Sequence, residues 1–131
     1  MIPRFRAWDK TCKTMYEADD IMYIDFEEKE ICVKTLFFEK ASRYDFDDIV
    51  LMQSTGLKDK NGKEIFEGDI VDYKGRKAVI KWHGSYASFI YMFVDELENR
   101  GQEWDPLYLS YYHFEVIGNK FETPEFLEVS S

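Results

Sequence analysis

Cationic and aromatic side chains that could bind a polyanion occur together in one short stretch of the sequence. Residues 74–81 contain three lysines and one arginine, and Tyr73 and Trp82 flank them. Cations neutralise phosphates and aromatic rings stack on bases, so this face around 74–81 is one candidate for nucleic-acid binding. The simpler interpretation, which we favour, places Trp82 in the core and leaves the lysines solvated. With two N-terminal arginines added, the candidate nucleic-acid contacts are Arg4, Arg6, Lys74, Arg76, Lys77 and Lys81.

A second group of aromatic side chains lies closer to the C-terminus. The chain has 11 Phe, 9 Tyr and 3 Trp, and a small barrel cannot bury every one of these rings. Aromatic residues are enriched at protein–protein interfaces, where they contribute much of the binding energy. We therefore expect protein binding and self-association through a candidate interface formed by Trp104, Tyr108, Tyr111 and Tyr112.

Catalytic and metal-binding patterns are missing from the sequence. It has no Gly-x-Ser-x-Gly nucleophile elbow and no Gly-x-x-x-x-Gly-Lys-Ser/Thr phosphate loop. Cys12 and Cys32 are not part of a Cys-x-x-Cys pair, and Asp59-x-Asn61-Gly62 lacks the spacing of a calcium loop. We expect no catalytic residue, no metal and no cofactor. An enzyme is the third alternative, and it would need carboxylates or His83 to converge in one pocket.

Charge and composition bound the partners and the compartment. The net charge is −9, which disfavours nucleic-acid binding over most of the surface. Residues 1–16 and 56–81 carry +3 and +2, whereas residues 17–48 and 95–131 each carry −7. The first residues lack the apolar region of a signal peptide, and no apolar run is long enough for a membrane span. We expect a cytoplasmic protein with two reduced, half-buried cysteines and no membrane partner.

Short alternating segments and frequent turn residues predict a mainly β protein with few short helical turns. Strand, turn and strand patterns between Gly68 and Val94 indicate a small SH3-like barrel. Asn61–Gly62 predicts a type I′ hairpin turn, residues 107–112 resemble a strand, and Thr123 is expected to cap a short helix. The predicted organisation is a β-rich N-terminal half over residues 1–55 and an SH3-like barrel half with a C-terminal extension over residues 65–131. One compact domain over the whole chain is the alternative.

Four stretches together resemble a known family. They are residues 2–9 (IPRFRAWD), residues 52–66 (MQSTGLKDKNGKEIF), residues 67–71 (EGDIV) and residues 114–119 (FEVIGN). The pattern is similar to the YopX family of small bacteriophage and prophage proteins. The resemblance implies a phage or prophage origin, a bacterial cytoplasmic location and a mainly β fold. The family's function is uncharacterised, so the resemblance brings no catalytic or binding residue.

These observations together predict a non-enzymatic phage or prophage accessory protein. It is expected to act by binding a host or phage protein and to form a homo-oligomer. A nucleic-acid-binding module is the alternative, and it predicts binding that weakens steeply with salt.

Overall fold

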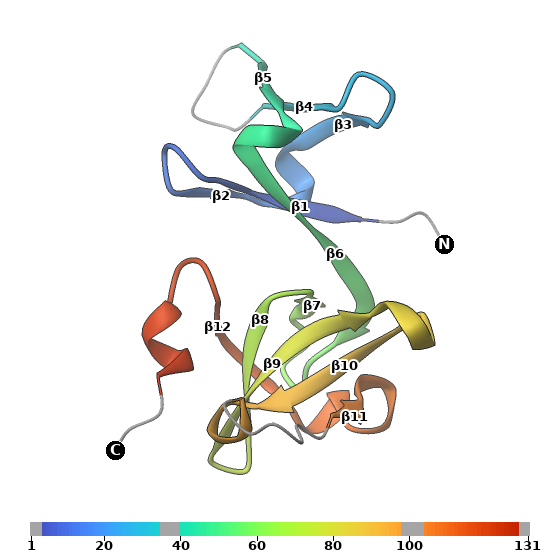
Figure 1. Cartoon of the computed structure of the whole chain (residues 1–131), viewed down its shortest axis with the longest axis vertical. Coiled ribbons are helices and arrows are strands. Elements are labelled where there is room, and N and C mark those ends of the chain that lie inside the picture. The colour runs from blue at the N-terminus through green and yellow to red at the C-terminus, as the bar shows by residue number, and fades with distance from the viewer. Residues whose placement is uncertain (1–3, 35–39, 98–103, 129–131) are drawn as a thin grey trace. The chain divides into compact units, whose positions relative to one another are not determined.

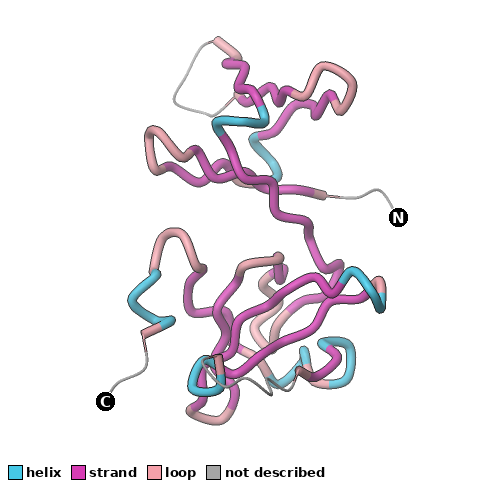
Figure 2. Tube along the Cα trace, viewed as in Figure 1, coloured by secondary structure: helices cyan, strands magenta, loops and turns pink. Residues whose placement is uncertain are grey.

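The computed structural model describes residues 4–34, 40–97 and 104–128 (Figure 1). The chain divides into two compact units, Met1–Gln53 and Ser54–Ser131. Strands account for most of the regular structure, and each helical segment in the described ranges is a short 3₁₀ turn (Figure 2). The predicted fold class, mainly β and barrel-like with few helical turns, is confirmed. The strands are β1 (Phe5–Asp9), β2 (Thr14–Tyr16), β3 (Ile21–Asp25), β4 (Glu30–Val33), β5 (Ser42–Asp45), β6 (Ile49–Lys58), β7 (Glu64–Phe66), β8 (Asp69–Tyr73), β9 (Arg76–His83), β10 (Ser88–Phe93), β11 (Asp105–Pro106) and β12 (Glu115–Asn119).

The first unit is built from two small antiparallel arrays. In one, β1 pairs with β2 and with the N-terminal half of β6; in the other, β4 lies between β3 and β5. Side chains from both arrays share one buried cluster, so the two arrays stabilise each other by removing apolar surface from water. The buried members of that cluster are Ala7, Tyr16, Ile31, Val33 and Ile49.

The second unit contains a five-stranded antiparallel sheet in the order β11-β10-β9-β8-β12. Strand β9 buries residues on both of its faces: Ala78 and Ile80 join one apolar cluster, and Val79 joins another. The larger cluster fills the curved inner face of the sheet, with Ile65, Val71, Tyr91, Leu107 and Phe114 as its other buried members.

A loop from the β6–β7 hairpin reaches the last strand of this sheet. Asp59 is 6% exposed, and its Oδ1 accepts hydrogen bonds from the N–H groups of Asn61 and Lys63, both at 2.9 Å. Its Oδ2 accepts from Val116 N–H in β12 at 2.9 Å, and the Lys60 N–H donates to the Phe114 carbonyl. One buried carboxylate therefore shapes the loop and ties it to β12.

The predicted type I′ turn at Asn61–Gly62 is wrong. Type I′ needs a positive φ at both central residues, and here only Gly62 has one, at 83°. The carboxylate of Asp59 organises a longer loop instead. The type I′ geometry occurs between β8 and β9, where Lys74 and Gly75 have φ values of 53° and 88° and Tyr73 pairs with Arg76.

Two further local predictions are also corrected. Residues 107–112, expected to be a strand, fall in two 3₁₀ turns, η5 (Leu107–Leu109) and η6 (Tyr111–His113). A 3₁₀ turn does form at η7 (Pro124–Leu127), but Thr123 does not cap it. Its Oγ1 instead accepts from the Asn119 N–H at 3.0 Å and donates to the Asn119 carbonyl at 2.9 Å.

The two cysteines differ in environment. Both are free thiols, as expected, but neither is half-buried: Cys12 is exposed and Cys32 is buried. Cys32 lies in β4 between two core residues, whereas Cys12 lies in the β1–β2 turn.

Candidate functional site

The two 3₁₀ turns that follow β11 present large apolar side chains to solvent. Tyr108 is 60% exposed, Leu109 is 59% exposed and Tyr112 is 55% exposed. Turns η5 and η6 are consecutive in the chain, so the three side chains come from one short segment. We call Tyr108, Leu109 and Tyr112 the turn surface.

The segment that carries the turn surface is firmly anchored. Leu107 precedes it and Phe114 follows it, and both are completely buried. Between them, the Tyr91 hydroxyl lies 3.2 Å from the Ser110 hydroxyl, to which it donates a hydrogen bond. The Tyr112 ring lies 4.2 Å from the His113 ring, centroid to centroid. The turn surface is therefore held in place before any partner arrives.

The structure separates the four candidate interface residues into two pairs. Tyr108 and Tyr112 are exposed as expected. Tyr111 instead packs against the main core cluster, and Trp104 packs against the buried cluster of Val79, Ile90 and Met92. Both are half-buried, so the first role of these two rings is to support the sheet and the turns.

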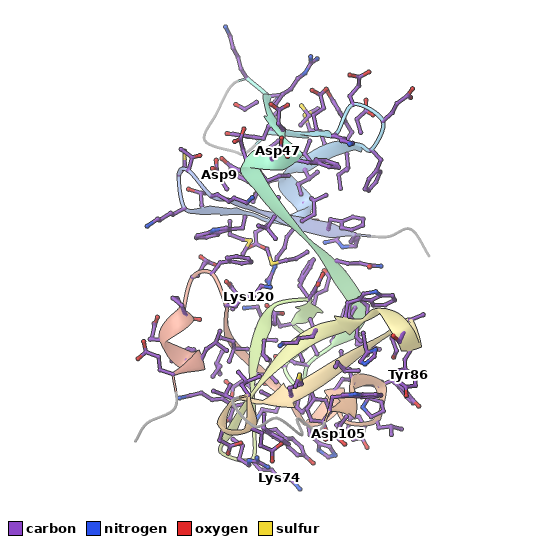
Figure 3. The ribbon with its side chains drawn as sticks, in the orientation of Figure 1. Asp9, Asp47, Lys74, Tyr86, Asp105 and Lys120 are labelled. Atoms are coloured by element: carbon purple, nitrogen blue, oxygen red, sulfur yellow. The ribbon has the colours of Figure 1, made fainter. Side chains whose placement is uncertain are left out.

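Trp104 also joins a cluster of three rings. Its ring centroid lies 4.9 Å from that of His83 and 5.0 Å from that of Tyr86, and the His83 and Tyr86 centroids are 4.8 Å apart. Tyr86, at the outer margin of the second unit (Figure 3), is 65% exposed. Trp82, which the sequence interpretation placed in the core, is 44% exposed and packs edge-to-face against Phe89. Its position at the end of β9 carries it beyond the buried part of that strand.

The candidate nucleic-acid contacts come from both units. Arg4 and Arg6 belong to the first unit, where Arg4 forms a 3.2 Å ion pair with Asp19. Arg6 is only 6% exposed, so its guanidinium is not a surface contact. Burial of Arg6 follows from its place in the middle of β1, which the sequence identified as a strand without showing which face is covered.

The four cations of residues 74–81 lie on the second unit but not on one face. Lys74 occupies the tip of the β8–β9 hairpin (Figure 3). Arg76 forms ion pairs with Asp95 at 2.8 Å and Glu96 at 3.3 Å, and its guanidinium lies 3.6 Å from the Phe93 ring centroid. Lys77 and Lys81 share the opposite face of β9 because strand side chains alternate. Arg76, the one arginine among these four cations, is therefore already paired with two carboxylates.

A buried polar network lies in the first unit. Asp9 is 2% exposed and Tyr16 is 7% exposed. The Tyr16 hydroxyl donates to Asp9 Oδ2 at 3.1 Å, and a 2.9 Å hydrogen bond joins the Tyr16 and Tyr44 hydroxyls. Thr11 and Cys12 donate their N–H groups to Asp9 Oδ1. Each member of the network has partners within the fold, so the network holds the β1–β2 turn.

Burial and hydrogen bonding shift the pKa values of this network in opposite directions. Burial raises the pKa of Asp9, but the hydrogen bonds from Cys12, Tyr16 and Thr11 outweigh it, and the pKa lies below its ordinary value. Burial, together with hydrogen bonds to Tyr44 and Asp9, raises the pKa of Tyr16 well above its ordinary value. At physiological pH the network therefore pairs an ionised Asp9 carboxylate with the neutral phenol of Tyr16.

None of the helices in the described ranges is long and apolar enough to cross a membrane.

A comparison with curated protein sequences finds no match. Two solved structures are similar over almost the whole chain. Protein EF1440 from Enterococcus faecalis has 31% sequence identity and a TM-score of 0.62, covering 98% of this chain and 99% of its own.

The second structure, protein yopX from Bacillus subtilis, has 21% identity and a TM-score of 0.59, with 98% of each chain covered. At that identity it supports the fold alone. The sequence profile of the YopX protein family matches residues 4–128. That match covers nearly the whole sequence, and this chain therefore belongs to the YopX family.

Proposed function

We propose that this YopX-family chain is a non-enzymatic accessory protein of a phage or prophage. It acts in the bacterial cytoplasm by binding protein, and its first partner is a second copy of itself. The contact is made by the turn surface of Tyr108, Leu109 and Tyr112. A host or phage protein is a further partner of the same surface.

The observation that carries this proposal is the exposure of three large apolar side chains on one anchored segment. Each of the three is at least 55% exposed, although burying such groups is favourable. Tyrosines are enriched among the residues that dominate protein interfaces, and a fixed aromatic side chain loses little conformational entropy on binding. Leu107 and Phe114, which are completely buried on either side of the segment, hold it in place.

The charge pattern favours a second copy as the partner. The protein carries a net charge of −9, so two copies repel each other over most of their surfaces. Between Trp104 and Phe114 the only charged residue is Asp105 when His113 is neutral. A two-fold interface brings the same patch of each copy together, and an uncharged patch can do so without like-charge repulsion.

Native mass spectrometry of the tagged protein, isolated gently from cells that carry the phage, tests the proposal. We expect a mass at an integer multiple of 15.7 kDa. A heavier complex with another protein would identify the further partner. A strict monomer that carries no protein would contradict the proposed function.

Bound nucleic acid in the same experiment would favour the alternative module that uses the face around residues 74–81. Lys74, Lys77 and Lys81 are the cations that the alternative relies on, because Arg76 is paired with Asp95 and Glu96. Its distinguishing test is charge reversal at Lys77 and Lys81 combined with a salt titration. If nucleic-acid binding is unchanged by both, this alternative is wrong.

A further inference from the structure

The first unit contains a pocket that neither the proposed function nor the sequence analysis uses. Its volume is about 410 Å³, which falls within the usual range for sites that enclose a ligand or a partner's side chains. All of its walls come from β1, η1 (Ala18–Asp20), β3 and the residues next to them. We call it the β3 pocket; it is lined by Arg4, Phe5, Ala18, Ile21, Met22, Tyr23, Ile24 and Phe26.

The walls of the β3 pocket are apolar but largely open to water. Met22 is 59% exposed and Phe26 is 62% exposed. The register between β3 and β4 shifts between Ile21 and Tyr23, so Met22 occupies a β-bulge, a device that redirects side chains at sheet edges. In the described residues β3 has one hydrogen-bonded neighbour, β4, and so lies at the edge of its array.

The Phe26 ring is held at the pocket by neighbouring rings. Its centroid lies 6.2 Å from that of Phe5 and 5.8 Å from that of Phe46, both in edge-to-face geometry. Phe26 therefore has a defined position despite its exposure, because edge-to-face pairs restrict how the rings can move. An aromatic wall of this kind can receive a flat or branched apolar side chain.

The sequence around the pocket is strongly acidic. Residues 17–30 contain seven carboxylates and one lysine. Glu17, Asp19, Glu27 and Glu28 are exposed. The one cation in the pocket lining, Arg4, forms an ion pair with Asp19. These carboxylates neighbour the lining residues in sequence, so we expect a negative potential at the pocket mouth, which favours a cationic partner over an anionic one.

We propose that the β3 pocket is a docking site for a basic segment of a partner protein. A bulky apolar side chain of that segment enters the pocket, and flanking lysines or arginines contact the surrounding carboxylates. Apolar burial supplies most of the affinity, and the charges supply the preference for this class of segment. The site lies in the first unit and is independent of the turn surface, so either proposal can fail without the other.

A pair of fluorescently labelled synthetic peptides tests the site on the full-length protein. One carries a central tryptophan flanked by lysines, and the other replaces each lysine by glutamate. Fluorescence anisotropy should give an affinity at least tenfold higher for the lysine peptide, and that preference should shrink as added salt screens the carboxylates. Equal binding of the two peptides, or binding of neither, would overturn the proposal.

Substitutions locate the binding. Met22→Ser should weaken binding of the lysine peptide about tenfold, because it removes an apolar wall residue. Tyr86→Ser is the control, since Tyr86 is 65% exposed, lies in the other unit and belongs to neither proposed binding site, and it should leave peptide binding unchanged. Phe26→Ser is a second pocket variant in case Met22→Ser lowers stability, which thermal unfolding of each variant will report.

Sedimentation of these pocket variants, alongside the turn-surface variant Leu109→Ser, distinguishes a second copy from the proposed basic segment. If Met22→Ser or Phe26→Ser dissociates an oligomer while Leu109→Ser does not, the pocket is filled by another copy of the chain. That result would overturn the assignment of a basic partner segment. Unchanged sedimentation of the pocket variants, together with lost peptide binding, would confirm it.

Discussion

The two units expose apolar side chains to nearly the same extent but in different settings. Met22 and Phe26 in the first unit are 59% and 62% exposed, and Tyr108 and Leu109 in the second are 60% and 59% exposed. The first pair lines a hollow within an acidic stretch, whereas the second stands on anchored turns in a nearly uncharged stretch. Exposed area alone therefore does not identify a partner, and shape and surrounding charge have to be considered with it.

The largest effect we predict concerns the aspartates that organise turns in each unit. Asp59 in the second unit is buried and accepts three backbone N–H groups, one of them from β12. Asp25 in the first unit is less buried and accepts two, both from its own turn. Asp59→Ala should cost about 3 kcal/mol in the free energy of unfolding, because it leaves buried donors without acceptors. Chemical denaturation measures this cost.

Asp25→Ala is the matched substitution and should cost less than about 1 kcal/mol, because water can replace the lost acceptor. Equal costs for the two substitutions would show that the long-range bond to Val116 contributes nothing. In that case the link between the loop and β12 would not stabilise the second unit.

A smaller effect, confined to the first unit, concerns the phenol network around Asp9. Tyr16→Phe removes a hydrogen bond to a buried carboxylate and should cost about 1–2 kcal/mol at neutral pH. The raised pKa of Tyr16 means that its stabilising effect is complete below pH 10 and is lost as the pH rises above that value. Above pH 10 the free energy of unfolding of the wild-type protein should therefore fall more steeply than that of Tyr16→Phe. The difference between the two slopes should be about 1.4 kcal/mol per pH unit.

At low pH the same network behaves in the opposite way. The pKa of Asp9 is lowered from an ordinary value of 3.8, so its stabilising effect is present above that value and is lost as the pH falls through the lowered pKa. Urea denaturation at a series of pH values measures both the loss of stability at high pH and the loss at low pH. Parallel curves for wild-type and Tyr16→Phe above pH 10 would contradict the role assigned to Tyr16.

The smallest effect should be the same in both units. Lys29 in the β3–β4 turn and Lys74 in the β8–β9 turn have positive φ values of 56° and 53°. A left-handed conformation is costly for residues with a Cβ, and glycine adopts it freely. Lys29→Gly and Lys74→Gly should each raise the free energy of unfolding by about 0.5 kcal/mol, since the extra entropy of glycine in the unfolded chain offsets part of the gain. Thermal unfolding measures both effects. If either glycine variant is less stable than the wild-type protein, the lysine at that position makes contacts that outweigh the strain.

The sequence predicted the features that depend on local pattern. Alternation and turn residues identified the succession of strands and turns between Gly68 and Val94. Asn61–Gly62 was assigned the wrong turn type because a buried carboxylate from Asp59 controls the loop, and burial cannot be inferred from a dipeptide. Leu107 and Phe114 explain why residues 107–112 form turns: two buried anchors at fixed places outweigh the strand propensity of the tyrosines between them.

The candidate sites were also predicted only in part. Tyr108 and Tyr112 were expected at an interface and are exposed, but Trp104 and Tyr111 of the same cluster pack against buried residues. Nothing in the local sequence distinguishes these pairs, because the difference depends on contacts with strands distant in the chain. The β3 pocket was not predicted. Its one available signal was the imperfect alternation at Met22, which the structure explains as a β-bulge.

Sedimentation equilibrium measures whether the turn surface joins two copies of the chain. The wild-type protein is compared with a Tyr108→Ser, Leu109→Ser, Tyr112→Ser triple variant, and Met22→Ser serves as a control of equal exposure in the other unit. We predict a wild-type oligomer that the triple variant weakens at least about 100-fold, as expected when central interface residues are truncated, and that Met22→Ser leaves intact. A wild-type monomer at concentrations of about 0.1 mM, or an oligomer that survives the triple substitution, would show that the turn surface does not join two copies.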